Sequence, residues 1–389
     1  MIPCADPGTG AELGLYLHIP FCLRKCPYCS FFSVPASPEK MARYCQALTR
    51  QIAGPAAANR IWDQPFATIF FGGGTPSILP VSDLAALLHA CRTAFSWSAA
   101  EVETSIEVNP ATVGEGELRR LRRAGFNRLS VGAQSLVDAE LRALGRPHCA
   151  AEVRAVVEAS RRAGFANLNL DLMFGLPGQT AAGWRRTLQA ALELAPEHLA
   201  IYELTIEENT RFAELREQGR LALPGEDEVL AMMASTAEET AGAGFARYEI
   251  SNYARPGRAC RHNLNYWHNG FYLGLGAGAV SCLAGRRSAA VQDIEQYCRL
   301  IEAGREPWVE VEELDLEARF RETVVMGLRL TGGVSLAALE RRFGLRALDY
   351  YGPTLRRLSE QGLVAIAGDN LRLTASGLAL ANQVMAELV

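Results

Sequence analysis

The stretch HIPFCLRKCPYC, residues 18–29, follows directly on a short apolar run that is typical of a β-strand. Its cysteines, Cys22, Cys26 and Cys29, are spaced by four and three positions, so one loop can direct three thiolates at a single small object. A structural zinc ion takes four ligands and a redox pair needs two. The spacing therefore favours a four-iron cluster with one iron left open. A zinc site completed by His18 or a more distant histidine is the alternative.

Outward from this loop, β-rich runs alternate with amphipathic helical segments over about the first two thirds of the chain, as in βα units. Three helical stretches close on Ala-Gly-Phe, at Gly125, Gly164 and Gly244, which is a helix-stop pattern. Six or more such units predict a full or partial (β/α) barrel, although an open doubly wound sheet has the same local pattern. The expected strands are Leu15 to His18, Thr68 to Phe71, Glu103 to Val108, Arg128 to Val131, Leu168 to Met173 and Leu199 to Glu203.

The composition, with 49% hydrophobic and 21% charged residues in 389, is that of a soluble globular protein. A formal charge of −4 leaves no basic excess for a polyanion, so no nucleic-acid partner is expected. Ten cysteines indicate metal ligands and buried thiols rather than a disulfide framework. Without a secretory signal or an apolar window near the ~18 residues that a spanning helix needs, we expect a cytoplasmic protein, at most peripheral at the inner membrane.

The Cys22-x3-Cys26-x2-Cys29 spacing resembles the signature of the radical S-adenosylmethionine (SAM) family. The flanking YLHIPF, residues 16–21, and the Pro27-Tyr28 pair are similar to oxygen-independent coproporphyrinogen III oxidases and their haem-chaperone, HemW-like relatives, and the similarity runs through most of the chain. The resemblance implies a 4Fe-4S cluster whose open iron chelates SAM. It also implies that an electron donor is needed if SAM is cleaved to a deoxyadenosyl radical.

Two features outside the cysteine loop predict a SAM site. The run Gly73-Gly74-Thr75 follows the second strand, and glycines let backbone groups approach a ligand closely. Glu107 places a carboxylate in an apolar strand, where it needs a partner. That partner is the ammonium group or ribose of SAM, or alternatively Arg128 in a structural pair.

The resemblance adds further positions around SAM, which without it would be ordinary turn, capping or packing residues. They are Tyr16, Tyr28, Gln134, Arg146 and Asp171.

A second unusual constellation, RHNLNYW at residues 261–267, crowds polar and aromatic side chains together. Aromatic bodies with polar tips suit a large flat ligand, although an aromatic-rich loop is more often simple packing. The pattern resembles the HemW-like branch, which implies that His262, Tyr266 and Trp267 contact haem. A histidine there could ligate the iron, and His268 is also available.

The chain divides into four expected parts: a flexible N-terminal tail over residues 1–13, the barrel over 14–255, a Gly- and aromatic-rich loop segment over 256–313 that covers one end of the barrel, and a winged-helix-like domain over 314–389. The last contains a hairpin around Gly368-Asp369-Asn370. Its basic residues in the recognition region are only Arg356 and Arg357, which favours a structural or protein-docking role over DNA binding.

Two departures from the oxidases favour the HemW-like branch: Phe31 stands where they carry a further cysteine, and only 21 residues precede Cys22. Val280 and the pair Ala289-Ala290 depart from many HemW-like chains and weigh against it. We expect a haem chaperone that delivers haem to recipient haemoproteins, with no catalytic residue assigned. The alternatives are a radical SAM enzyme of tetrapyrrole metabolism, acting by coproporphyrinogen III oxidative decarboxylation or radical haem modification, and a non-catalytic, metal-stabilised docking protein.

Overall fold

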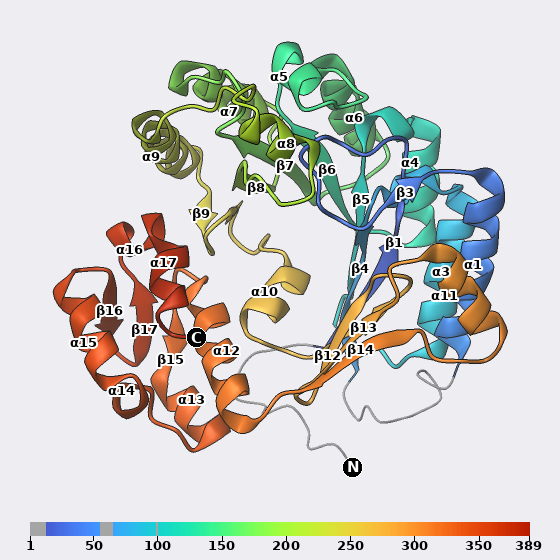
Figure 1. Cartoon of the computed structure of the whole chain (residues 1–389). Coiled ribbons are helices and arrows are strands. Elements are labelled where there is room, and N and C mark those ends of the chain that lie inside the picture. Colours follow the sequence, from blue (N-terminus) through green and yellow to red (C-terminus); the bar gives the residue numbers. More distant parts are fainter. Residues whose placement is uncertain (1–12, 55–64, 99) are drawn as a thin grey trace.

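Six parallel strands stand side by side in chain order in the computed structural model, which describes residues 13–54, 65–98 and 100–389 (Figure 1). Because their order never reverses, they form a partial barrel and not a doubly wound sheet, which confirms the expected fold class. The strands are β1 (Leu13–Ile19), β4 (Phe66–Gly73), β5 (Glu103–Val108), β6 (Arg128–Gln134), β7 (Leu168–Phe174) and β8 (His198–Glu203). The tail expected over residues 1–13 lies outside the described residues except for Leu13, which begins β1.

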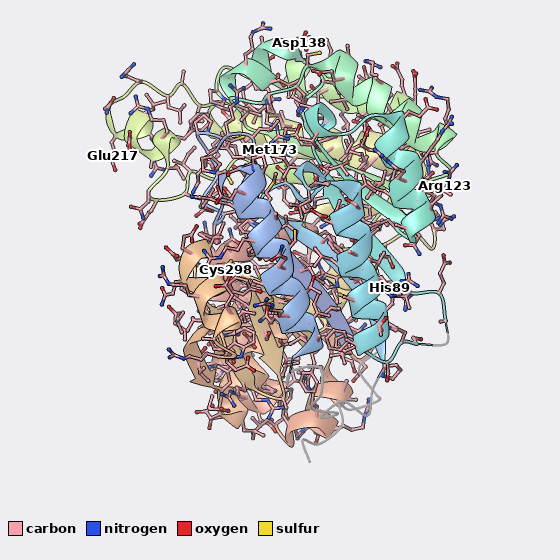
Figure 2. All side chains as sticks on the ribbon, turned by 90° about the vertical axis from the view of Figure 1, so that its right-hand side faces the viewer. His89, Arg123, Asp138, Met173, Glu217 and Cys298 are labelled. Atoms are coloured by element: carbon pink, nitrogen blue, oxygen red, sulfur yellow. The ribbon has the colours of Figure 1, made fainter. Side chains whose placement is uncertain are left out.

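Helices cover the outer face of these strands, and Figure 2 shows three of them, α1, α3 and α4, side by side. Apolar residues at alternate strand positions, such as Leu15, Leu17 and Phe71, are fully buried beneath them. Gly125 ends α4 in the left-handed conformation, with φ 112°, as the helix-stop pattern predicts. The helices of this layer are α1 (Pro38–Ala53), α3 (Val81–Ala94), α4 (Glu115–Ala124), α5 (Asp138–Ala143), α6 (Ala150–Arg162), α7 (Ala181–Glu193), α8 (Arg211–Glu217) and α9 (Glu226–Gly242).

The sheet continues past both ends of the parallel set to twelve strands, and its two outermost strands do not pair with each other among the described residues. The barrel is therefore open on one side. Beyond β1 lie β11 (Tyr272–Leu275), β12 (Val280–Leu283), β13 (Arg286–Ala290) and β14 (Trp308–Glu313), with α11 (Ile294–Glu302) before the last; beyond β8 lie β10 (Asn252–Ala254) and β9 (Ala246–Arg247).

The expectation of a loop for the HNLNYW stretch is wrong, because these residues form the helix α10 (Arg261–Trp267). Its N-terminus is capped by a carboxylate from a distant strand: Glu103 of β5 accepts hydrogen bonds from the backbone N–H groups of Arg261, at 3.1 Å, and His262, at 3.2 Å. A local sequence pattern cannot show such a cap.

The C-terminal part packs around its own apolar core, which includes Phe320, Leu339 and Leu371. It contains a three-stranded sheet with the expected hairpin at residues 368–370, and Arg357 of its recognition region pairs with Glu387. Its elements are α12 (Leu316–Leu328), β15 (Val334–Ser335), α13 (Leu336–Phe343), α14 (Ala347–Tyr350), α15 (Gly352–Glu360), β16 (Val364–Ala367), β17 (Asn370–Leu373), α16 (Ala375–Ala379) and α17 (Ala381–Ala386).

This domain lies at the open side of the barrel, next to α10 (Figure 1). Backbone hydrogen bonds join Ile250 N–H to the Arg329 carbonyl and Thr331 N–H to the Tyr248 carbonyl, each at 3.1 Å. The Arg329 side chain pairs with the buried Glu249 carboxylate at 3.3 Å. The open side is thus filled by a separately packed unit.

The Tyr44 hydroxyl ties α1 to two parts of the sheet, because it donates to the His18 carbonyl at 2.7 Å and accepts from Ala277 N–H at 3.0 Å. Tyr44→Phe leaves both groups buried without a partner and should lower the free energy of unfolding by about 1–3 kcal/mol, measured by urea denaturation. The matched control is Tyr272→Phe, whose hydroxyl makes no hydrogen bond to a described residue and whose loss should cost less than about 0.5 kcal/mol. Equal losses in the two variants would contradict this role of Tyr44.

Candidate functional site

The cysteine loop leaves the barrel at the carboxyl end of β1 and is clamped at its base. The short strands β2 (Phe21–Cys22) and β3 (Val34–Pro35) pair there, with Val34 N–H donating to the Pro20 carbonyl at 2.8 Å. Farther out, Cys29 N–H donates to the Cys26 carbonyl at 3.1 Å, and all three thiols are partly exposed. The chain thus holds three accessible thiols on one anchored loop.

The neighbours of these thiols fit an iron-sulfur cluster. Thr75 Oγ1 lies 3.6 Å from Cys22 Sγ, and the Arg146 guanidinium lies 3.7 Å from Cys26 Sγ, where it can balance thiolate charge. Burial raises the pKa of Cys29, and the other two thiols raise it further. In the described part of the chain, no three His, Cys, Asp or Glu side chains are arranged around one point as metal ligands would be. Cluster binding therefore requires the three thiols to turn toward a common point.

The glycine turn lies directly against the cysteine strand. Gly74 N–H donates to the Ile19 carbonyl at 2.9 Å, and Thr75 N–H donates to the Phe21 carbonyl at 2.8 Å. A Cβ on Gly74 would lie 2.7 Å from the Phe21 carbonyl oxygen. Gly73, at φ 117°, has the His18 ring 2.8 Å from the position of a Cβ. Glycine is therefore required at both positions, because the two segments approach so closely.

Two carboxyl groups face the barrel interior. Glu107 accepts a hydrogen bond from Gly73 N–H at 3.2 Å, and burial together with Asp171 raises its pKa to about 8. Asp171 accepts from Asn169 Nδ2 at 2.6 Å, and burial raises its pKa to about 6. These two described residues, Glu107 and Arg128, form no ion pair with each other, although the charge of Arg128 acts to lower the pKa of Glu107. The structural pair considered for Glu107 therefore does not form.

The remaining residues expected around SAM lie in two groups. Arg146 donates to the Gly132 carbonyl at 2.9 Å, and Gln134, at φ 65°, ends β6 beside it. Burial raises the pKa of Tyr28, which lies with Arg146 at the same edge of the sheet. Tyr16 is deeper, with its hydroxyl 3.1 Å from His18 Nδ1. The structure therefore brings most of the expected SAM residues to the cysteine edge, with Tyr16 and Asp171 below them.

The helix α10 lies at the opposite end of the barrel, across the amino ends of β1, β4 and β5. Besides the Glu103 cap, His262 Nδ1 lies 2.7 Å from Thr68 Oγ1 near the start of β4, and its ring is 3.1 Å from the position of a Cβ on Gly14 at the start of β1. The structure thus places the cysteine loop and α10 at opposite ends of the barrel, but the two sets of candidate residues meet inside it, where the Tyr16 and His262 rings stack with their centroids 6.4 Å apart.

The candidate haem residues differ in how many contacts they already make within the protein. His262 is 1% exposed, both of its ring nitrogens have partners (Thr68 and, at 3.0 Å, the Tyr266 hydroxyl), and burial lowers its pKa to about 3. Trp267 lies under the Arg329 guanidinium at 4.3 Å. The half-buried His268 ring makes no hydrogen bond to a described residue. Iron binding by His262 requires the hydrogen bond of one ring nitrogen to break, whereas iron binding by His268 requires none to break.

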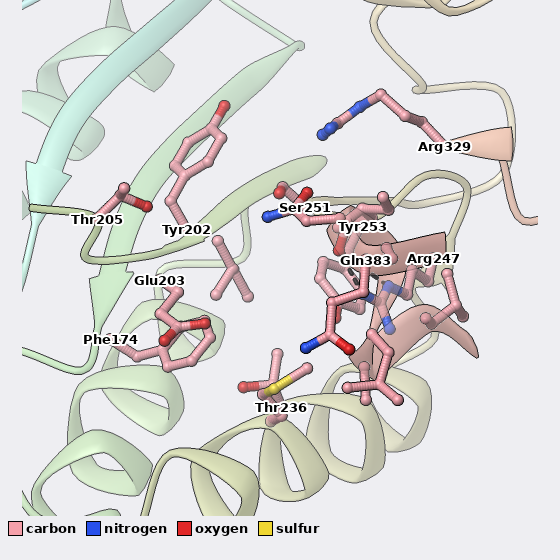
Figure 3. Close-up of a pocket in the computed structure, with 18 residues that line it drawn as sticks. Phe174, Tyr202, Glu203, Thr205, Thr236, Arg247, Ser251, Tyr253, Arg329 and Gln383 are labelled. Carbon is pink, nitrogen blue, oxygen red and sulfur yellow. Dashed lines mark hydrogen bonds between the residues drawn. The ribbon is translucent and has the colours of Figure 1, made fainter. Parts of the chain in front are cut away.

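A cavity of about 220 Å³ lies inside the barrel between these two ends, lined by Glu107 and Asp171 as well as by His262 and Tyr266. A larger cleft of about 410 Å³, shown in Figure 3, lies between β8, residues 247–253 and residues 378–383. Sequence reasoning missed both. Polar residues at alternate positions of otherwise apolar strands could have predicted the cavity from the sequence. No sequence pattern predicts the cleft, because segments that are distant in the chain form it. The missed cavity residues are Ser130, Asn169, His198, Tyr202 and Asn252, while Arg128 was expected only as a partner of Glu107 and Asn263 only as part of the RHNLNYW motif.

The open (β/α) barrel with a three-cysteine loop at the carboxyl end of its first strand defines a radical SAM protein. Residues 16–191 match the Radical SAM superfamily, and residues 314–380 match the HemN C-terminal domain. The chain is 36% identical to the haem chaperone HemW of Bacillus subtilis (strain 168), covering 95% of this chain and 97% of that protein, and 39% identical to the haem chaperone HemW of Escherichia coli (strain K12) over 69% of each. The chain therefore belongs to the HemW family, and the radical SAM class implies a 4Fe-4S cluster and SAM.

Among solved structures, the fold matches coproporphyrinogen III oxidase (HemN) from Escherichia coli with a TM-score of 0.83 at 24% identity, covering 98% of this chain and 90% of that one. Within the described part of the chain, no helix is both long and apolar enough to cross a membrane.

The Gly74 contact predicts a specific effect of one methyl group. Gly74→Ala forces the glycine turn away from the strand that carries Cys22, and overpacking of this kind typically costs about 1–3 kcal/mol. We expect SAM binding to weaken about tenfold and the iron content after anaerobic reconstitution to fall. Gly116→Ala is the control, because a Cβ there meets no atom within 4 Å. Unchanged SAM affinity in Gly74→Ala would contradict the prediction.

The raised pKa of Glu107 predicts how stability depends on pH. The folded protein holds this proton more tightly than the unfolded chain between the ordinary pKa of 4.5 and the folded pKa of about 8. The free energy of unfolding should therefore fall as pH rises across that window. Glu107→Gln should flatten the fall, measured by urea denaturation at pH 5 and pH 8 without SAM or cluster. Glu158→Gln, an exposed change on α6, should keep the wild-type slope; equal slopes in wild type and Glu107→Gln would refute the prediction.

Proposed function

We propose that this protein binds haem and passes it to recipient haemoproteins, and that it carries a SAM-binding 4Fe-4S cluster on Cys22, Cys26 and Cys29. The observation that carries the proposal is the similarity to relatives named haem chaperone HemW over almost the whole length of the chain. A location in the cytoplasm, at most peripheral at the inner membrane, belongs to the same proposal, as does an electron donor if SAM is cleaved.

Each end of the barrel has its own part in this proposal. At the cysteine edge, Gly73, Gly74 and Thr75 present backbone groups to SAM, and Glu107 receives its ammonium group or ribose. The other SAM contacts are Tyr16, Tyr28, Gln134, Arg146 and Asp171. When bound, the cluster would supply the electron that cleaves SAM. The residues of this chain would orient SAM and exclude water around it.

At the opposite end, α10 supplies the haem contacts through His262, Tyr266 and Trp267. Its buried cap on Glu103 supports a binding role, because a ligand on this helix would meet a rigid platform. Two candidate iron ligands lie on or directly after this helix, His262 and His268. His262 would have to break a hydrogen bond to bind iron, whereas His268 would not.

The test starts from the anaerobically reconstituted full chain. Haem titration should give a Soret shift and a stable complex, and incubation with coproporphyrinogen III, SAM and reductant should give no decarboxylation. Robust decarboxylation would favour the enzyme alternative and overturn the chaperone proposal. Absence of any haem complex would overturn it as well.

Two single variants then locate the iron ligand. Loss of the axial ligand should weaken haem binding about tenfold or more and change the Soret spectrum, so His262→Ala and His268→Ala separate the two candidates. His89→Ala is the matched control, since His89 is exposed on α3 at the outer face of the barrel (Figure 2). If both variants bind haem like the control, α10 does not supply the ligand.

A further inference from the structure

Arg128, the first residue of β6, is a buried cation without a partner. It is 2% exposed, its Nε is buried without a hydrogen bond, and no ion pair or hydrogen bond joins its guanidinium to another described residue. The guanidinium groups of Arg146 and Arg329 also have a buried Nε without a hydrogen bond, but each has a partner through another nitrogen. Arg329 pairs with Glu249 at 3.3 Å, and Arg146 donates to the Gly132 carbonyl at 2.9 Å. Glu103 and Asp171 lie close enough to help raise the pKa of Arg128, but neither forms an ion pair or hydrogen bond with it. A buried charge without hydrogen bonds is unfavourable, so its place indicates an anion that is supplied by a ligand.

The acidic residues around Arg128 are committed elsewhere. Glu103 caps α10 through two backbone N–H groups, and Asp171 accepts from Asn169 at 2.6 Å and from Ser130 at 3.3 Å. Glu107 accepts from Gly73 N–H, and its pKa of about 8 keeps it protonated and uncharged at neutral pH. A neutral carboxyl group does not repel an incoming anion and can donate a hydrogen bond to it.

The space in front of Arg128 is small and polar, and a larger cleft adjoins it. Arg128 lines the 220 Å³ cavity, where Asn252 Oδ1 is also buried without a partner. Tyr202 lines both this cavity and the 410 Å³ cleft of Figure 3. The walls of the cleft are mixed, because apolar side chains such as Phe174 and Met233 stand beside the charged Glu203, Arg247 and Arg329.

We propose that Arg128 binds a carboxylate of the ligand, and that this carboxylate is a propionate arm of haem that reaches into the cavity, which His262 and Tyr266 of α10 also line. The planar guanidinium fork matches a carboxylate with two parallel hydrogen bonds. The 220 Å³ cavity has room for a short carboxylate arm and is smaller than a typical site for a whole drug-sized ligand. The inference rests on haem binding as the proposed function.

The test compares haem with its dimethyl ester, in which both propionates are masked, by Soret titration of the reconstituted full chain. Wild type should bind haem about tenfold more tightly than the ester, since a charge-assisted hydrogen bond is worth about 1.5–3 kcal/mol. Arg128→Met should bind the two equally, and Arg128→Lys should keep part of the preference. Arg123→Met, an exposed change on α4, should keep all of it (Figure 2).

Each of the other outcomes refutes one part of the proposal. If wild type binds haem and its ester equally, the role of Arg128 is refuted while haem binding stands; if wild type binds no haem, the proposed function itself fails. If Arg128→Met keeps the preference for haem but loses SAM affinity, the carboxylate is that of SAM and the propionate assignment is wrong. If Arg128→Met does not fold, the preference for haem over the ester in wild type and in Arg128→Lys decides whether Arg128 binds a propionate.

Discussion

The structure depends on the contact between the glycine turn after β4 and the strand that carries the first cysteine. The N–H groups of Gly74 and Thr75 bind carbonyls of that strand, and no side chain fits between the two segments. The contact sets the position of Cys22 relative to the turn expected to hold SAM. Gly73 extends the same link to Glu107 on the next strand. The cysteine loop, the glycine turn and the first interior carboxyl therefore form one rigid unit.

A second fixed point lies at the other end of the barrel. The Glu103 carboxylate begins α10 and holds it across the amino ends of the strands, and His262 is locked between Thr68 and Tyr266. Because β5 carries both Glu103 and Glu107, one strand connects the platform of α10 to the SAM edge. The polar cavity between them contains Arg128, which makes the interior of this barrel a place for ligand charge and not only for packing.

The C-terminal domain packs against the open side of the barrel. Arg329 reaches from that domain to the buried Glu249 and over Trp267, so the domain contacts both the end of the sheet and α10. The larger cleft exists only because residues 378–383 complete a wall that β8 begins. This arrangement agrees with a docking role for the domain and explains why it has a core of its own and yet contributes to a site.

The sequence by itself determined the parallel strands, the helix stops, the cysteine loop and the glycine turn, whereas the strand order in the structure decided between a barrel and a doubly wound sheet. These features arise from local periodicity, backbone conformation and ligand spacing, which short segments carry on their own. The branch of the family also followed from motifs within single segments. The helical state of α10 did not, because its cap comes from Glu103, more than 150 positions earlier. Only the tertiary structure placed the cysteine loop and α10 at opposite ends of the barrel, brought the two sets of candidate residues together in the cavity between them, left Arg128 without a hydrogen-bonded partner and formed the cleft. Each of these depends on contacts between segments that are distant in the chain.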